Sequence, residues 1–578
     1  MQNPSGEMTS AQKAMLILIL AVALALRLHL IWHDYPYTYN PDEPFYVQEG
    51  IYLAAGHLPT YYARPTFYLY FLALADALFY GVGRLTGLFS SLTDFQLYYI
   101  SHTADFTMIA RLVSAAFSWL TVFLVFEAGR RFYGPLCGLA AAALLAVSPL
   151  HVEYAHQAVT DTAMVFWSTF VLLGSFSILK GGSSASYAIS GLFVGLATAT
   201  KYPAVFSALA VAAAHFARAD RKGLFTWFFR PRVAYAVAAA ALGFLIGCPF
   251  VIIDYHKFMR DVLERIQIMS APWIGLNPYS TGFELYIREV FLKGEGMAWT
   301  AACCAAVLFL LARHRREDLV LLAFPVPFFI YIGLKQYAAD RYVMPALPYF
   351  EVALGAFLVF LAEMILKTFA HPRRSEAPSA PRAAQNALLA LITALVLIQP
   401  AWNVVQKMRD WARPQIRVDA LNWIEANIPR AGNRLFVDYT TYAPPLTKAE
   451  GGVRDMVLHF AAKYNLSEKD PLIRKHLSVL EGHPEYYLDM ITYPTSPTLA
   501  AAVGPELPWR NYDYVIICGV TRHMVMSSPD YPVLAPFRRF FQSLETQAQL
   551  VARFEPRKKT SPTGPIEVYK VHKNTPKA

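Results

Sequence analysis

Long apolar runs recur along this chain and constrain its fold more than any other feature. The first run extends from Ala14 to Ile31, and similar runs follow at intervals up to about residue 404. About 20 consecutive apolar residues can cross the hydrocarbon core of a bilayer as a helix. The chain of 578 residues is 56% apolar and only 16% charged, whereas soluble domains average about 25% charged residues. The sequence therefore predicts a polytopic α-helical membrane protein.

Basic residues concentrate in short loops between these runs. Such clusters occur at Arg130-Arg131, between Arg218 and Arg232, and between Arg313 and Arg316. Short loops rich in Lys and Arg face the cytoplasm. This pattern accounts for the net charge of +10, so we exclude nucleic acid as a partner. The first run lacks a signal-peptide cleavage site, and we expect it to be an uncleaved helix with a cytoplasmic N-terminus.

About eleven membrane-spanning helices satisfy the loop charges, which places the C-terminus outside. The apolar stretch from Tyr68 to Val82 is left out of this count, because as a span it would put Arg130 and Arg131 outside. Its Tyr and Phe content also suits a helix in the membrane interface. The predicted spans cover about 14–33, 109–128, 135–149, 162–179, 186–199, 203–217, 233–253, 297–312, 319–334, 343–366 and 385–404.

The composition changes after about residue 404, where apolar runs become short and prolines and charges return. Residues 417–427 have helical periodicity, and three short segments are typical of buried strands. These strand segments are 435–439, 514–518 and 566–571. We therefore predict a transmembrane domain over 1–404 and a soluble, extracytoplasmic α/β domain over 405–578, which is long enough to bury its own core.

Ionisable residues lie at the predicted outer ends of the helices. They include Asp42, Glu43, Asp161, Lys201 and Arg341. Charged groups at such positions are costly if they face lipid, so they commonly face a cavity or one another. Acids and bases that converge there would suit a substrate with a phosphate and a hydroxyl. The bases would bind phosphate oxygens, and an acid would accept the hydroxyl proton.

Each of these residues also has a structural interpretation, and spacing alone does not decide between the two. Asp42 and Glu43 could cap the helix that follows them, and Asp161 could cap the helix that begins beside it. Lys201 and Arg341 could be interfacial anchors whose aliphatic stems lie along the membrane.

Spacing alone predicts no metal site. His151 and His156 share an outer loop but lack metal-ligand partners at a convincing spacing. The five cysteines form no C-x-x-C pattern. We therefore name no metal ligand and no certain cofactor, and leave a divalent metal open.

Six short motifs, in order along the chain, resemble those of the GT-C-fold glycosyltransferases that use polyprenyl-phosphate-linked sugars. The likeness is greatest to the protein O-mannosyltransferase and aminoarabinose-transferase group (glycosyltransferase families 39 and 83), and it covers about residues 14–350. Each motif is weak, but their shared order and topological placement make the signal specific. The motifs are P-D-E-P-F-Y at 41–46, R-P-T-F-Y at 64–68, A-R-L at 110–112, S-P-L-H at 148–151 followed by Thr160-Asp161, T-K-Y-P at 200–203 and R-Y-V-M-P at 341–345.

This resemblance implies roles for the outer residues. Asp42 would be the general base, with Glu43 supporting it, and Asp161 would be a second acid in the cavity. The donor phosphate would be bound by cations that offset the charge of the leaving group, and a single displacement would invert the anomeric centre. The expected phosphate ligands are Lys201, Arg64 and Arg341, and the expected acceptor or sugar contacts are Tyr46, His151 and Tyr202.

Two positions depart from the family pattern. Thr66 replaces the second proline of a Pro-Pro pair, and Ala63 replaces an acid found in the aminoarabinose branch, which puts a metal in doubt. The resemblance implies transfer of a sugar from a polyprenyl-phosphate donor to a hydroxyl of a lipid, glycan or protein acceptor. We expect this at the extracytoplasmic face of the bacterial inner membrane. The alternative is a transporter or flippase of lipid-linked sugars, although the internal repeat common in transporters is not evident.

Overall fold

The computed structural model describes most of the chain. The described residues are 8–218, 230–270, 281–369, 382–413, 415–429, 432–438, 443–481, 485–490, 507, 509–528, 531–556 and 564–572. Most of the basic loop predicted between Arg218 and Arg232 lies outside these ranges, as does Tyr439 at the end of the first predicted strand.

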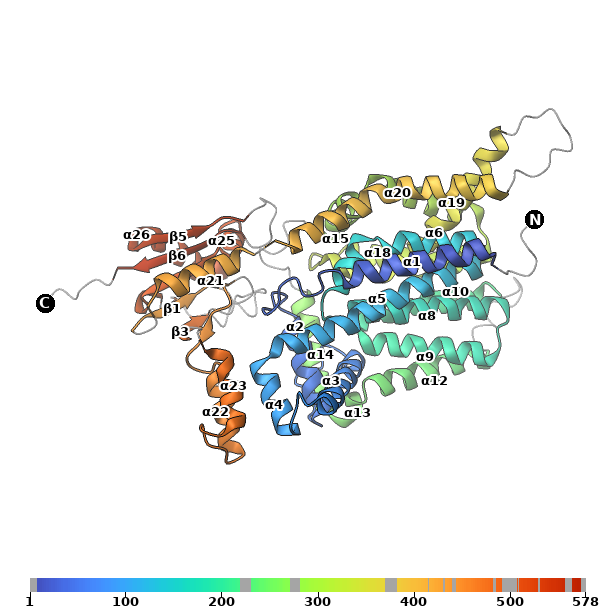
Figure 1. Cartoon of the computed structure of the whole chain (residues 1–578). Helices are drawn as coiled ribbons and strands as arrows, with labels where there is room; N and C mark the ends of the chain where they lie inside the picture. Colours follow the sequence, from blue (N-terminus) through green and yellow to red (C-terminus); the bar gives the residue numbers. More distant parts are fainter. Residues whose placement is uncertain are drawn as a thin grey trace, which may run out of the picture.

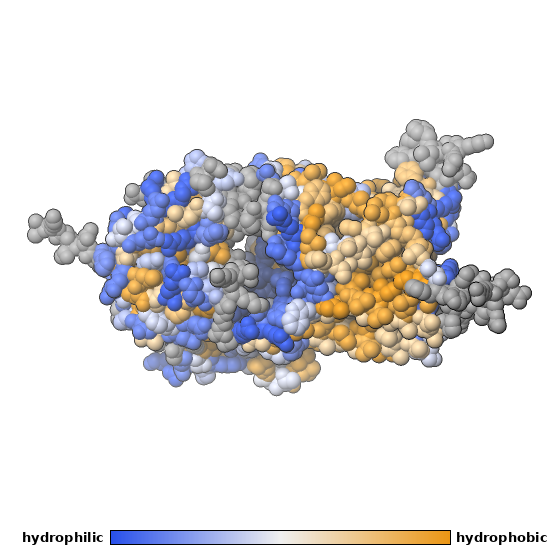
Figure 2. All heavy atoms as spheres, turned by 90° about the horizontal axis from the view of Figure 1, so that it is seen from above, coloured by the Kyte–Doolittle hydropathy of each residue, from blue (hydrophilic) through white to orange (hydrophobic). Residues whose placement is uncertain are grey.

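Apolar helices that run side by side form the larger part of the molecule (Figure 1). Hydrophobic surface covers them, whereas the opposite part of the molecule is largely hydrophilic (Figure 2). This division fits a helix bundle whose outer surface contacts lipid. Its helices are α1 (Ser10–Leu28), α5 (Thr103–Tyr133), α6 (Pro135–Ala146), α8 (Asp161–Lys180), α9 (Ser184–Thr200), α10 (Ala208–Phe216), α12 (Pro231–Gly247), α16 (Met297–Arg313), α17 (Arg316–Leu322), α18 (Pro325–Gly333), α19 (Leu347–Phe369) and α20 (Arg382–Trp411).

The number of membrane spans stays a prediction. Six described helical segments are long and apolar enough to cross a membrane, or up to eight if each of two bent helix pairs is one span. Several other predicted spans coincide with shorter apolar helices, such as α9 and α12 with 17 residues each. A predicted boundary between domains at residues 404 and 405 falls inside α20, which continues to Trp411.

Helix α3 (Phe67–Thr86) is the apolar stretch that the loop charges leave out of the spans. It meets the length and hydropathy criterion for a span. However, Figure 1 shows it nearly end-on, across the direction of α5 and α8, next to the amphipathic helix α14 (Tyr255–Ser270). This orientation favours a helix in the membrane interface.

A sharp bend separates α6 from α7 (Pro149–Ala155), and the two axes differ by 61°. Ser148 caps α7 by accepting a hydrogen bond from the backbone of His151. Arg27 of α1 is fully buried and donates to the carbonyl oxygens of Leu145 (3.3 Å) and Ala146 (3.0 Å) at the end of α6. Carbonyls at a helix end lack intrahelical partners; the backbone N–H of Ser148 also reaches the Leu145 oxygen at 3.3 Å. Arg27 adds hydrogen bonds to both carbonyls and so stabilises the bend that leads into the second outer loop.

The C-terminal part contains a six-stranded mixed sheet in the order β2-β3-β1-β4-β6-β5. β1 pairs in parallel with β3 and β4, and β6 pairs antiparallel with β4 and β5. The three predicted strands are confirmed as β1, β4 and β6. The strands are β1 (Arg434–Val437), β2 (Thr447–Lys448), β3 (Glu485–Met490), β4 (Tyr514–Cys518), β5 (Ala548–Phe554) and β6 (Ile566–Val571), and α21 (Ile416–Asn427), α25 (Gly519–Met526) and α26 (Ala535–Gln547) accompany them.

Among the contacts between described residues that join this α/β part to one end of the helix bundle, two involve charged side chains. In the first, the guanidinium of Arg417 on α21 lies 4.2 Å from the ring centroid of Tyr39. In the second, α22 (Val453–Lys463) and α23 (Pro471–Leu477) pack against α4 (Leu92–Ser101) around a small apolar cluster. Asp94 of α4 accepts hydrogen bonds from Lys475 and from His476, each at 2.9 Å.

Replacing Asp94 with Asn should loosen the contact between α4 and the two helices. Burial favours a raised pKa for Asp94, but hydrogen bonds from Ser90, Lys475 and His476 outweigh it and lower the pKa to about 2. Because the folded-state pKa is depressed, this stabilisation is present above the unfolded value of about 3.9 and is lost as the pH falls toward 2. At neutral pH, Asp94→Asn should therefore accelerate hydrogen exchange in α22 and α23. The exposed Glu468→Gln is the control, and unchanged exchange in Asp94→Asn would contradict this prediction.

Candidate active site

Asp42 lies between two arginines that are far from it in sequence. It precedes α2 (Glu43–Ala54), but its side chain makes no capping hydrogen bond to that helix. Instead, Arg64 Nη2 donates to Oδ1 at 2.7 Å, and Arg341 Nη2 donates to Oδ2 at 2.9 Å. Arg341 belongs to the 3₁₀ segment η3 (Asp340–Ala346) before α19. The capping interpretation of Asp42 is therefore wrong, and its carboxylate belongs to a cluster of charges.

Asp161 joins the same cluster from the first turn of α8. Lys201, at the end of α9, donates from Nζ to Asp161 Oδ1 at 2.6 Å. Arg341 Nε lies 4.0 Å from Asp161 Oδ2. The structure thus brings together three cations and two acids from five separate segments, and we call them the charge network: Arg64, Asp42, Arg341, Asp161 and Lys201.

The charge network lines a cavity of about 490 Å³. Tyr46 and Tyr202 also line it, whereas much of the remaining wall is apolar. Arg64 lies 4.4 Å and 5.0 Å from the ring centroids of Phe45 and Tyr46, which limits its movement. Apolar wall residues include Met164, Val205, Phe206, Ile266, Met269, Phe328 and Ile332. One cavity therefore offers charged groups beside a surface suited to a hydrocarbon chain.

The surroundings of Asp42 keep it ionised. Its burial favours a raised pKa, but the positive charges of Arg64 and Arg341, and more weakly of Lys201, outweigh this effect and hold the pKa below its ordinary value. Asp42 is therefore a carboxylate at neutral pH and can accept a proton. Its affinity for that proton is reduced as long as both arginines contact it.

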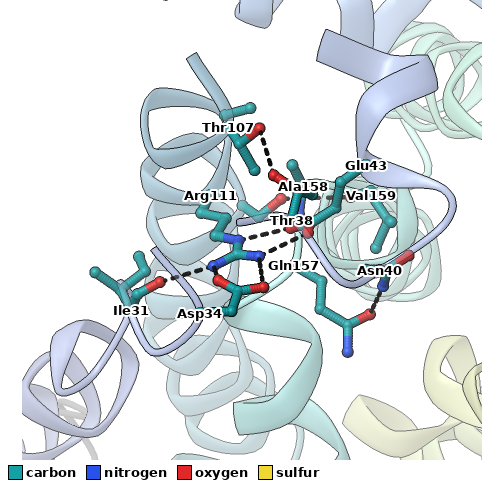
Figure 3. A network of polar contacts seen from close by, with 12 residues as sticks. Ile31, Asp34, Thr38, Asn40, Glu43, Thr107, Arg111, Gln157, Ala158 and Val159 are labelled. Atoms are coloured by element: carbon teal, nitrogen blue, oxygen red, sulfur yellow. Dashed lines mark hydrogen bonds and ion pairs between the residues drawn. The ribbon is translucent and has the colours of Figure 1, made fainter. Parts of the chain in front are cut away.

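Glu43 is fully buried, does not line the cavity and belongs to a network of polar contacts (Figure 3). Arg111 of α5 donates to both Glu43 oxygens at 2.7 Å and to the two Asp34 oxygens at 2.6 Å and 2.9 Å. Glu43 also accepts a hydrogen bond from the backbone N–H of Ala158 at 2.8 Å. Through Arg111 and the Ala158 backbone, Glu43 thus connects the loop before Asp42 to the loop before Asp161.

The predicted acceptor or sugar contacts separate into two groups. Tyr46 and Tyr202 line the cavity, and the hydroxyl of Tyr202 donates to the Tyr62 carbonyl at 2.7 Å. His151 is fully buried in α7 and outside the cavity lining, with its Nδ1 2.8 Å from Arg27 Nη2. The described structure therefore gives His151 a packing environment and no access to the cavity.

Metal-ligating side chains do not gather in the described part of the chain. No group of three or more His, Cys, Asp or Glu residues there is placed to hold a metal ion. His156, the other histidine of the second outer loop, contacts the carbonyl oxygens of Val152 (2.8 Å) and His29 (2.9 Å).

Solved structures share this fold over nearly the whole chain. ArnT from Cupriavidus metallidurans in its apo state is 14% identical, with 97% of this chain and 99% of that chain covered and a TM-score of 0.51. The same enzyme bound to undecaprenyl phosphate gives 14% identity, 98% and 99% coverage and a TM-score of 0.51. The apo oligosaccharyltransferase from Archaeoglobus fulgidus is 15% identical, with 91% and 72% coverage and a TM-score of 0.50. These likenesses define the GT-C fold as the class of this protein.

The sequence comparison is more local. Residues 99–253 match the family model described as dolichyl-phosphate-mannose-protein mannosyltransferase. This range carries Arg111, Asp161 and Lys201. No curated protein sequence matches the chain. The predicted resemblance to GT-C glycosyltransferases is confirmed by the matched family and the shared fold, which together indicate an integral membrane glycosyltransferase.

Proposed function

We propose that this protein transfers one sugar from a polyprenyl-phosphate carrier to a hydroxyl of a lipid, glycan or protein acceptor. The observation that carries the proposal is the single cavity in which Asp42 and Asp161 meet Arg64, Lys201 and Arg341 beside an apolar wall. ArnT, which has the same fold, is known with undecaprenyl phosphate bound. That complex supports a lipid phosphate as the ligand of this cavity.

The reaction would be a single displacement at the anomeric carbon. Arg64, Arg341 and Lys201 bind the donor phosphate, and the lipid chain lies along the apolar wall. Asp42 accepts the proton of the acceptor hydroxyl while the oxygen of that hydroxyl forms the new bond to the anomeric carbon of the sugar. The bond between the sugar and the phosphate oxygen breaks, and the cations stabilise the charge that develops on the phosphate. Attack opposite the leaving group inverts the anomeric configuration, and Asp161 orients Lys201.

The proposal also assigns sides of the membrane. Tyr39, three residues before Asp42, contacts Arg417 of the α/β part, so the cavity and this part lie at the same end of the bundle. We place that end outside, with the N-terminus in the cytoplasm and about eleven spans, because the basic loops face inward. The bacterial inner membrane is the proposed location, and the α/β part is the proposed extracytoplasmic domain.

Sugar transfer should release free polyprenyl phosphate. We expect the purified full chain, reconstituted in vesicles with undecaprenyl-phosphate-linked mannose or aminoarabinose and an extract of envelope lipids and glycans, to produce undecaprenyl phosphate and a glycosylated acceptor. Both products are measured by mass spectrometry, and Arg341→Gln should slow their formation because one phosphate ligand is lost. Movement of the intact donor across the bilayer with no release of undecaprenyl phosphate would instead favour a flippase.

A further inference from the structure

Both carboxylate oxygens of Asp42 are engaged by guanidinium groups. Arg64 holds one oxygen at 2.7 Å and Arg341 holds the other at 2.9 Å. These are the same two arginines that the proposed function assigns to the donor phosphate. Hydrogen bonds and positive charges that favour the ionised form of a carboxylate reduce its affinity for a proton. In the ligand-free chain, Asp42 is therefore shielded from acting as a base.

The charges of the network match a substrate with one phosphate. Three cations and two carboxylates leave a net charge of +1, and a sugar-phosphate diester carries a single negative charge. During transfer, the leaving phosphate gains a second negative charge, and the hydroxyl proton moves to Asp42, which becomes neutral. The network and its ligand are therefore electrically balanced both before and after the reaction. In a partly buried site, an excess of charge of either sign is costly, and such balance avoids it.

Two further cations line the cavity outside the charge network. Arg265 lies 5.8 Å from the ring centroid of Tyr337, and Lys335 lies 4.9 Å from that of Tyr331. Both line the cavity, yet Lys335 is exposed, so solvent screens its charge. The charges that act most strongly on Asp42 are those of Arg64, Arg341 and Lys201, and Asp161 is the second acid of the network.

We propose that donor phosphate frees Asp42 by competing for Arg64 and Arg341, so that the acceptor hydroxyl is activated only when the donor is in place. This inference rests on the proposed function and adds a binding order to it. The phosphate attracts both guanidinium groups and reduces the positive potential at Asp42. The carboxylate then regains its affinity for a proton at the moment when a sugar is available for attack.

A competing arrangement is compatible with the same residues. Arg64 Nη1 is buried and has no hydrogen-bond partner in the described part of the chain. Phosphate could bind there and leave both contacts of Asp42 unchanged. In that case, the donor would bind without altering the proton affinity of Asp42, and donor and acceptor could bind in either order.

Proton uptake on ligand binding distinguishes these arrangements. Undecaprenyl phosphate serves as the probe and is titrated calorimetrically into the full chain in nanodiscs, in two buffers with different ionisation enthalpies, at about pH 5.5. If phosphate raises the pKa of Asp42 toward the working pH, the wild type should take up more protons per bound lipid than Asp42→Asn, and the difference should approach half a proton when the pKa reaches that pH. The variant should bind the probe at least as tightly, because it lacks the carboxylate that competes for the arginines.

A matched control is Glu153→Gln, which removes a partly buried carboxylate that pairs with Lys407 outside the cavity lining. It should keep the proton uptake of the wild type. Equal proton uptake by the wild type and Asp42→Asn would overturn the inference, and so would loss of undecaprenyl phosphate binding in Asp42→Asn. Neither result would contradict the proposed function of sugar transfer. If the wild type did not bind undecaprenyl phosphate at all, the proposed function itself would fail, and the inference with it.

Discussion

Asp42→Asn is expected to lower the rate of sugar transfer by about 10²- to 10⁴-fold, the usual effect of removing a general base. The amide has nearly the same shape as the carboxylate, but it cannot accept the proton of the acceptor hydroxyl. The release of undecaprenyl phosphate under saturating donor measures kcat for both proteins. Because Asn also removes a negative charge from between Arg64 and Arg341, the variant should retain its affinity for the lipid phosphate.

Measuring kcat together with the affinity for the lipid phosphate separates a catalytic defect from misfolding. A misfolded variant loses both phosphate binding and turnover, whereas a variant without its base loses turnover alone. Glu153→Gln should transfer sugar at the wild-type rate. A folded Asp42→Asn protein with full activity would rule out Asp42 as the base and make Asp161, the other acid of the cavity, the first alternative.

The sequence predicted the location of the site better than the orientation of its residues. Apolar runs and loop charges placed Asp42, Asp161, Lys201 and Arg341 at one end of the helices, and the structure brings them within ion-pair distance. This succeeded because residues at the same ends of neighbouring spans are brought together by the topology. Arg64 was added only by its resemblance to a family motif, because its loop has no helical periodicity.

Side-chain direction could not be predicted in this way. Asp42 and Glu43 are adjacent, yet one faces the cavity and the other faces Arg111. Adjacent residues at the start of a helix point in directions about 100° apart. Asp34 was missed altogether, although a buried arginine in an apolar helix, such as Arg111, requires acidic partners. The need of Arg111 for acidic partners could therefore have pointed to Asp34 from the sequence.

Arg111→Gln should be among the most destabilising single substitutions in the chain. All five N–H groups of Arg111 are used, on Asp34, Glu43 and the Ile31 carbonyl, and its side chain is 1% exposed. Removing one partner of a buried ion network leaves uncompensated charges and costs about 3–5 kcal/mol. Thermal unfolding of the detergent-solubilised protein measures the loss. The more exposed Arg130→Gln is the control and should cost no more than about 1 kcal/mol.

A triple variant tests whether Arg111 serves stability or the placement of Asp42. Combining Arg111→Met with Asp34→Asn and Glu43→Gln removes all three charges. The free energy of unfolding of this variant should therefore be higher than that of Arg111→Gln and closer to that of the wild type. Activity should stay low, because the connection from Glu43 to Arg111 that holds the loop before Asp42 is broken. If activity returned together with stability, the network would serve folding alone. Recovery of stability without activity would show that the buried network sets the geometry of the cavity.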